Sequence, residues 1–163
     1  GPSLQQCFDL VRETSVRPIA DAKALLHWVV FNFLIGNTDA HGKNISLLLT
    51  EKGPMLAPFY DLMSTAVYAE LAQRHAMRLG GEDRPEWIIE RRWQAFAEEV
   101  GIGYKLVRQT LLEMKERVSE EAAALAADFE KAYGKVGIIG KILSIIEQRK
   151  NKIANMPAAG DRK

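Results

Sequence analysis

The sequence predicts a mainly α-helical domain (α+β) with one small β-hairpin inserted near its N-terminal third. Apolar residues recur every three or four positions along most of the chain, which is the period of one helix face. Two short apolar segments flank a Gly-Pro turn, as in a hairpin. The 163 residues are 47% hydrophobic and 26% charged, which suits a globular chain with a single core.

The N-terminal part is predicted to hold two helices. The apolar positions of the first are Leu4, Phe8 and Val11. The second covers residues 22–35 and is apolar nearly all round, so we expect it in the middle of the domain. Asp21 precedes this run and is predicted to be its N-cap, and Gly36 ends it.

The predicted hairpin comes shortly after the buried helix. Its apolar segments are residues 45–50 and 55–59, and the turn between them is residues 51–54. A further short extended piece is predicted at residues 75–79, closed by Gly80 and Gly81.

Three apolar stripes predict helices in the remainder. They comprise Ile89, Trp93, Phe96, Ala97 and Val100; Val107, Leu111, Met114, Val118, Ala122, Leu125 and Phe129; and Ile138, Ile142, Ile145, Ile146 and Ile153. Tryptophans at helical spacing, Trp87 included, are predicted to pack in the core, and the basic cluster from Arg149 to Lys152 is predicted to be solvated.

Charge and composition exclude several classes of function. The 22 Lys and Arg residues against 21 Asp and Glu residues give a net charge of +1, which disfavours strong direct nucleic-acid binding by this chain alone. No apolar run approaches the roughly 20 residues of a membrane span. The single cysteine, Cys7, excludes an internal disulfide. These features indicate a soluble cytoplasmic protein without a membrane partner.

The chain ends are expected to lie outside the folded domain. Gly1-Pro2-Ser3 is typical of what a protease leaves after removing a purification tag. The domain itself is predicted over residues 4–154, and residues 155–163 are small and polar, so we expect a flexible tail there.

A polar loop, residues 37–44, directly follows the most apolar helix. Within it Asp39 and Asn44 lie five positions apart, and a further acid, Asp61, follows the hairpin. Phosphoryl transfer from ATP uses a carboxylate beside the attacking hydroxyl, together with an amide and a second carboxylate that hold Mg²⁺. Kinase catalytic loops space their Asp and Asn in the same way. The pattern therefore favours phosphoryl transfer.

Each of these three residues on its own also fits a purely structural role. The loop residues suit an ordinary turn at the end of a helix, and Asp61 suits the cap of a helix near Met63. Their common register nevertheless favours the catalytic interpretation. A zinc hydrolase using Asp39, His41 and Asp61 is disfavoured, since the sequence has no H-x-x-x-H or H-E-x-x-H pair.

Two stretches resemble a known family. They are Phe31-Asn-Phe-Leu-Ile-Gly-Asn-Thr-Asp-Ala-His-Gly-Lys-Asn44 and Leu56-Ala-Pro-Phe-Tyr-Asp-Leu-Met-Ser-Thr65. Both are similar to the HipA-type serine/threonine kinases, the toxin kinases of bacterial toxin–antitoxin pairs. Residues 77–81 and 93–97 resemble the same family more weakly, and the similarity extends from Leu4 to about Ile153.

The resemblance implies a fold and a set of roles. The fold would be the helical C-terminal lobe of a protein-kinase-like fold, and the activity would be transfer of the ATP γ-phosphate to a protein hydroxyl. Asp39 would be the catalytic base, and Asn44 and Asp61 would be the Mg²⁺ ligands. The residues expected against the nucleotide are His41, Lys43, Asn44, Tyr60 and Asp61.

Partners also follow from the resemblance. Substrates in the family include aminoacyl-tRNA synthetases, and members can associate with a DNA-binding antitoxin. The ATP lobe of the family would precede the region present here, so the isolated chain is expected to transfer phosphate very slowly or not at all.

Two alternatives stay open at this point. In one, the chain is a non-catalytic helical module that binds an antitoxin or another protein partner. In the other, which ranks low, it is a small-molecule phosphotransferase of the aminoglycoside or choline type. Those enzymes carry His-Gly before the catalytic Asp, whereas Asn37-Thr38 precedes Asp39 here.

Overall fold

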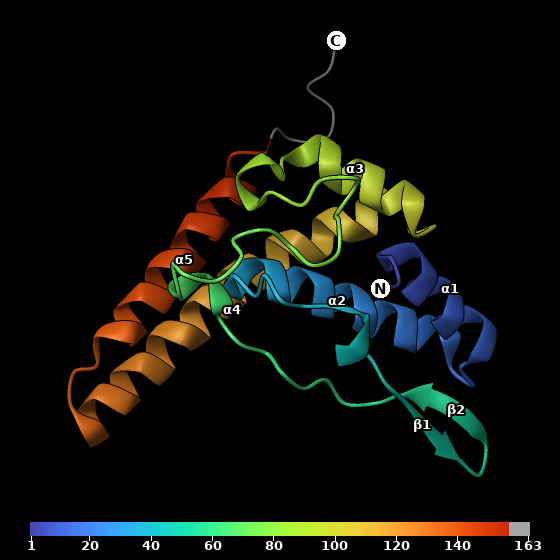
Figure 1. Ribbon diagram of the computed structural model, residues 1–163, viewed down its shortest axis with the longest axis horizontal. Helices are drawn as coiled ribbons and strands as arrows, with labels where there is room; N and C mark the ends of the chain where they lie inside the picture. The colour runs from blue at the N-terminus through green and yellow to red at the C-terminus, as the bar shows by residue number, and fades with distance from the viewer. Residues whose placement is uncertain (157–163) are drawn as a thin grey trace.

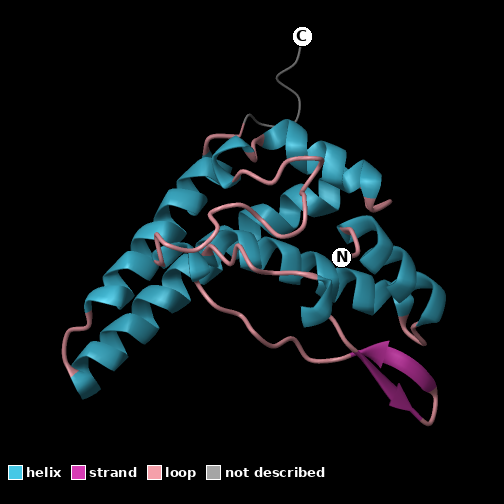
Figure 2. Ribbon diagram, in the orientation of Figure 1, coloured by secondary structure: helices cyan, strands magenta, loops and turns pink. Residues whose placement is uncertain are grey.

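The computed structural model describes residues 1–156 as a mainly helical domain with one two-stranded antiparallel sheet (Figures 1 and 2). The elements are α1 (Leu4–Thr14), α2 (Pro18–Ile35), β1 (Leu47–Thr50), β2 (Gly53–Leu56), α3 (Glu90–Glu99), α4 (Tyr104–Tyr133) and α5 (Gly137–Ala154), with short 3₁₀ turns at Gly42–Asn44, Thr65–Val67 and Pro85–Trp87. This arrangement confirms the predicted fold class. Most of the predicted tail, residues 157–163, lies outside the described residues.

Helix α2 is the central element, and α1, α4 and α5 all contact it (Figure 1). Within residues 1–156 it is the one helix long and apolar enough to suit a membrane span, yet 56% of it is buried inside the domain. An aromatic cluster fixes α3 to this core, because Phe33 meets Trp93 edge-on with ring centroids 5.3 Å apart. Phe96 in turn lies edge-on to Phe8 of α1 at 5.9 Å.

The start of α2 differs from the prediction. The helix begins at Pro18 with Arg17 as its N-cap residue, so the assignment of Asp21 as N-cap was wrong. Proline suits the first turn, where its missing N–H has no helical acceptor to bond. Asp21 lies one turn into the helix, and its buried carboxylate accepts the N–H of Leu56 at 2.7 Å and the hydroxyl of Ser15 at 2.6 Å. The carboxylate thus joins the hairpin to α2.

The hairpin is shorter than predicted. Leu47 pairs with Leu56 and Thr50 with Gly53, which leaves a two-residue turn. The piece predicted at residues 75–79 contributes only one isolated bridge, between Leu79 and Glu82 on either side of the Gly-Gly turn.

Helices α4 and α5 extend beyond the rest of the domain as a two-helix arm (Figure 1). The buried residues of α4, which are Val107, Thr110 and Leu111, all lie in its first third. Its far half carries exposed apolar side chains, Leu125, Phe129 and Tyr133 among them. The far half of α4 therefore has little core of its own.

Two surface predictions were also wrong. Trp87 is 50% exposed, and the guanidinium of Arg84 lies over its ring at 5.2 Å, so it is not a core residue. Arg149, which was predicted to be solvated with the rest of its basic cluster, is buried against the ring of Phe33.

Candidate active site

The polar loop leaves α2 at Gly36, whose φ of 71° lies in the left-handed region. A side chain here would be strained and crowded, because a Cβ would stand 2.7 Å from Cγ2 of Ile145 in α5. The carbonyl oxygen of Gly36 accepts the N–H of Ala66 at 2.9 Å. The loop therefore starts from a fixed point beside the segment that follows the hairpin.

Asn37 connects the loop to the segment after the hairpin. Its Nδ2 donates to Oδ1 of Asn32 at 2.8 Å and to the carbonyl oxygen of Asp61 at 3.0 Å. Its Oδ1 accepts the N–H of Asp39 at 3.2 Å. Asn32 is itself held within α2, since its Nδ2 donates to the carbonyl oxygen of Trp28 at 2.8 Å. One buried amide thus orients both the Asp39 and the Asp61 backbones.

Asn44 and Asp61 are in direct contact. Nδ2 of Asn44 lies 2.8 Å from Oδ2 of Asp61, although 17 residues separate them. Oδ1 of Asn44 accepts the N–H of His41 at 2.9 Å, which fixes the orientation of the amide. Asp61 has a φ of 58° and is the one non-glycine residue with positive φ among the described residues. Aspartate tolerates this conformation better than most residues, and strain of this kind collects at functional sites.

Thr38 braces the loop from a second side. Its N–H donates to Oγ1 of Thr65 at 2.7 Å, and its hydroxyl donates to the carbonyl oxygen of Ala72 at 2.9 Å. Its carbonyl oxygen accepts the N–H of Ala76 at 2.9 Å. Sequence reasoning assigned no role to Thr38 or Asn37. The one available signal was the position of Asn32 as a polar residue inside an apolar helix.

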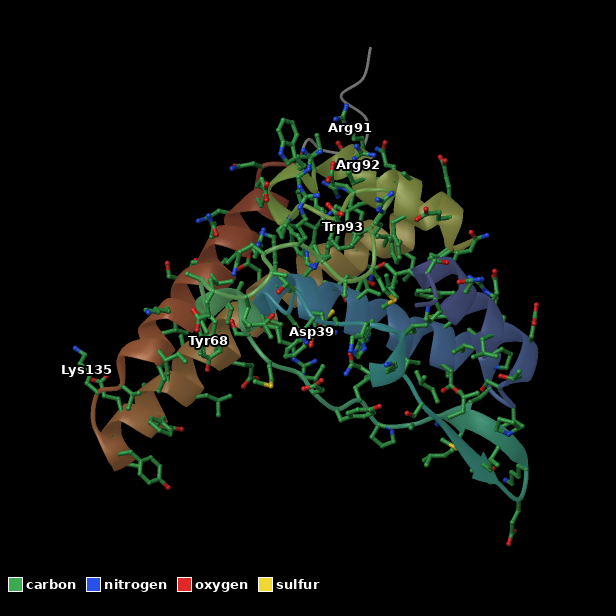
Figure 3. All side chains as sticks on the ribbon, viewed as in Figure 1. Asp39, Tyr68, Arg91, Arg92, Trp93 and Lys135 are labelled. Atoms are coloured by element: carbon green, nitrogen blue, oxygen red, sulfur yellow. The ribbon has the colours of Figure 1, made fainter. Side chains whose placement is uncertain are left out.

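Asp39 is exposed and lies beside α2 near the centre of the view (Figure 3). Within residues 1–156 its carboxylate has neither a hydrogen bond nor an ion pair, so both oxygens are open to a ligand. The structure does not place it in contact with Asp61. The two residues are linked through Asn37 instead.

The other predicted site residues lie in the same two segments. The hydroxyl of Tyr60 donates to the carbonyl oxygen of Lys43 and lies 3.3 Å from Oγ of Ser46, so Tyr60 holds the segments together. The side chain of Lys43 is exposed. Nδ1 of His41 is buried and has no hydrogen-bond partner within the described part of the chain.

The donor set of this site suits a hard cation. Asp61 offers carboxylate oxygens and Asn44 an amide oxygen, and these are ligands that Mg²⁺ accepts together with water and phosphate oxygens. The amide oxygen of Asn44 has one lone pair engaged by His41 and one still available. Across residues 1–156 no three His, Cys, Asp or Glu side chains cluster closely enough to hold a metal. A zinc arrangement of Asp39, His41 and Asp61 is therefore not formed.

A family model described as the HipA-like C-terminal domain matches residues 1–149. The chain belongs to the HipA family. It is 40% identical over 133 residues to the protein Y4mE of Sinorhizobium fredii, covering 82% of this chain and 32% of that relative. It is 33% identical over 123 residues to the serine/threonine-protein kinase toxin HipA of Shewanella oneidensis, covering 76% of this chain and 28% of that toxin.

A solved structure shares the HipA fold. It is described as the Shewanella oneidensis MR-1 toxin–antitoxin system HipA, HipB and its operator DNA complex. The match has a TM-score of 0.86 and 27% identity, and it covers 96% of this chain and 37% of that chain. The resemblance drawn from the two sequence stretches is confirmed, and this chain corresponds to the C-terminal domain of a HipA-like kinase family member.

Proposed function

We propose that this HipA domain carries the phosphoryl-transfer residues of an ATP-dependent protein serine/threonine kinase. The observation that supports this most is the 2.8 Å contact between Asn44 and Asp61, with Asp39 on the same loop. A base, an amide and a second carboxylate in this order are the parts that phosphoryl transfer from ATP requires. The name of the Shewanella oneidensis relative, a serine/threonine-protein kinase toxin, agrees with this chemistry.

Asp39 acts as the base in this proposal. Its carboxylate is exposed and unpaired among the described residues, so it can accept a hydrogen bond from the hydroxyl of a serine or threonine. Its backbone is fixed by Asn37, which limits the positions that the carboxylate can take. Asp39 then takes the proton of the hydroxyl as the oxygen attacks the γ-phosphorus of ATP, and the bond from that phosphorus to the bridging oxygen breaks, so that ADP leaves.

Asn44 and Asp61 would hold Mg²⁺ with one amide and one carboxylate oxygen. When bound, the ion supplies positive charge that offsets the negative charge of the ATP phosphates. Lys43 would add a further positive charge from its exposed side chain, while His41 and Tyr60 would line the nucleotide. Tyr60 also fixes Lys43 through its hydrogen bond to the Lys43 carbonyl oxygen.

The whole protein is proposed to act in the bacterial cytoplasm on a protein substrate, an aminoacyl-tRNA synthetase being one candidate. An antitoxin that binds DNA is the proposed partner. The solved complex of HipA, HipB and operator DNA supports this second, binding function. The chain spans about a third of the length of the relatives it matches, so these proposals concern the longer protein of which such a domain forms part.

The test is transfer of the labelled γ-phosphate of Mg-ATP to protein. It uses the full-length protein that carries this domain and, beside it, the 163-residue chain. Asp39→Asn and Asp61→Asn keep the side-chain size, and asparagine tolerates the left-handed backbone of position 61. We expect each variant to lower the transfer rate by about 10²–10⁴-fold. The chain alone should be far slower than the full-length protein.

Asp128→Asn is the matched control, since Asp128 is an exposed carboxylate on α4. It should transfer phosphate at the unaltered rate. Undiminished transfer by Asp39→Asn would remove the catalytic assignment. If the Asp39→Asn protein still forms a complex with its antitoxin, the binding function is independent of catalysis.

A further inference from the structure

A hollow of about 390 Å³ lies between the C-terminal end of α5 and the segment that leads into α3. Its lining differs entirely from that of the proposed active site. Four amide side chains and two cations face it, namely Gln73, Gln148, Asn151, Asn155, Arg149 and Lys152. Such a lining is rich in hydrogen-bond donors and carries positive charge.

Arg149 is the most unusual member of this lining. It is only 9% exposed, and its guanidinium lies over the ring of Phe33 at 5.3 Å. Its Nε is buried without a hydrogen-bond partner, and within residues 1–156 the guanidinium forms no ion pair. Burial lowers the pKa of Arg149, since a charge taken out of water loses hydration. The charge of Glu86 raises that pKa in part, but Glu86 forms no ion pair with the guanidinium, and a buried cation without a paired anion is costly.

Lys152 does not supply that compensation, because it is a second cation. Its Nζ donates to the backbone carbonyl oxygen of Glu86, and no carboxylate pairs with it among the described residues. Burial and the nearby charge of Arg149 lower the pKa of Lys152, while Glu86 raises it. Glu86 is the one carboxylate of the described lining, and it forms no ion pair with either cation. The hollow therefore holds two positive charges against one negative charge.

We propose that this hollow is a binding site for a phosphate group. The planar fork of Arg149 can donate two parallel hydrogen bonds to phosphate oxygens, and Lys152 can add a point charge. The side-chain amides of Gln148, Asn151 and Asn155 can donate to the remaining oxygens, which outnumber those of a carboxylate. Nε2 of Gln73 already donates to the carbonyl oxygens of Tyr68 and Leu71, so Gln73 lines the hollow without a free donor. A volume of about 390 Å³ exceeds one phosphate, so the group would belong to a larger molecule such as a phosphorylated side chain.

One segment of the chain contributes to the lining of the hollow and also contacts the polar loop. Gln73 follows Ala72, whose carbonyl oxygen accepts the hydroxyl of Thr38. Thr38 precedes Asp39. A phosphate group held by Arg149 and Lys152 would therefore lie beside Gln73, next to the residue whose carbonyl oxygen binds Thr38. Binding at the hollow does not depend on the proposed kinase activity, so the two can be tested separately.

The test is a titration of the ¹⁵N-labelled 163-residue chain with inorganic phosphate, followed by NMR at constant ionic strength. The side-chain Nε–H of Arg149 is the reporter, because it has no partner in the structure. We expect a saturable shift of that signal and of the Gln148 and Asn151 side-chain amides. The same titration is repeated with O-phosphoserine and with acetate. Tighter binding of O-phosphoserine than of inorganic phosphate would show that the site also contacts the molecule that carries the phosphate group. Equal binding would show that the site contacts the phosphate group alone.

Variants on α5 make the result specific. Arg149→Lys keeps the charge but loses the fork, and should weaken phosphate binding about tenfold. Lys152→Gln should weaken it severalfold, and it remains informative if the buried Arg149 variant does not fold. Lys141→Gln removes an exposed cation of the same helix outside the hollow and should bind like the unaltered chain. Absence of a saturable shift, an equal loss in Lys141→Gln and Lys152→Gln, or tighter binding of acetate than of phosphate would overturn the proposal.

Discussion

Nδ2 of Asn37 lies 3.0 Å from the carbonyl oxygen of Asp61, although 24 residues separate the two. The same nitrogen donates to Oδ1 of Asn32, so one buried amide group ties the end of α2 to the segment beyond the hairpin. The position of the Asp61 carboxylate therefore depends on a side chain that has no chemical role of its own.

Asn37→Ala should consequently destabilise the fold and displace Asp61. Removal of the amide leaves the buried oxygen of Asn32 without its donor, and we expect a loss of about 1–3 kcal/mol in the free energy of unfolding. Chemical denaturation measures this loss. Gln109→Ala, which alters an exposed amide on α4, should change the same quantity by less than about 0.5 kcal/mol. Equal effects of the two changes would mean that the Asn37 bridge contributes nothing to stability.

The backbone of Asp61 predicts an order of stability for the unaltered protein and two variants, Asp61→Asn and Asp61→Ala. Its φ of 58° suits asparagine and glycine but strains alanine, so Asp61→Ala should be less stable than Asp61→Asn by about 1–2 kcal/mol. Asp61→Asn also keeps an oxygen that can accept the amide of Asn44. Thermal or chemical unfolding of the three proteins gives the order. A more stable Asp61→Ala protein would show that position 61 is not left-handed in solution.

Asp21 makes the stability depend on pH. Its carboxylate is only 1% exposed, and although burial would raise its pKa, hydrogen bonds from Leu56 and Ser15 and the charge of Arg17 lower that pKa overall. A lowered folded pKa means that the stabilisation is present above the unfolded value, about 3.9, and is lost as the pH falls through the folded value. Asp21→Asn should therefore cost about 2 kcal/mol at pH 7 and clearly less near pH 3.

Unfolding titrations of both proteins across this pH range check the prediction for Asp21. Asp9→Asn is the comparison, since Asp9 is 48% exposed and, among residues 1–156, pairs with Arg12 alone. A constant difference between the Asp21→Asn and unaltered proteins from pH 7 to pH 3 would contradict the assigned role.

Gly36→Ala should destabilise the junction between α2 and the polar loop. The left-handed backbone alone costs about 1–2 kcal/mol with a Cβ, and contact with Ile145 adds to it. Gly140→Ala is the matched control, because Gly140 lies within α5 and its Cβ would meet nothing within 4 Å. That change should stabilise the protein by about 0.5–1 kcal/mol. Opposite signs in the two unfolding free energies are the expected result.

Periodicity predicted the helices because each buries one face, and the spacing of Asp39, Asn44 and Asp61 predicted the candidate site. The contact between Asn44 and Asp61 agrees with that pattern. The bridge through Asn37 could not be predicted, since it depends on the left-handed turn of Asp61 brought close by the hairpin. Asp21 was misplaced as a cap because its carboxylate serves a tertiary contact with Leu56, which local sequence does not reveal.

The burial of Arg149 could not be predicted from the sequence either. A basic cluster at a helix end is usually solvated, yet this one guanidinium is buried against the ring of Phe33. Burial of a single member of a cluster depends on which elements pack against the helix, and the helical period alone does not specify it.

The far half of α4 has no fully buried residue and meets chiefly α5, so this half of the helix can melt while the aromatic cluster around Trp93 stays folded. Such a segment forms a cooperative unit of its own. Its amide protons should exchange with deuterium through small local openings, whereas those of α2 should exchange only when the entire domain unfolds. The domain would then have two levels of thermodynamic stability within a single chain.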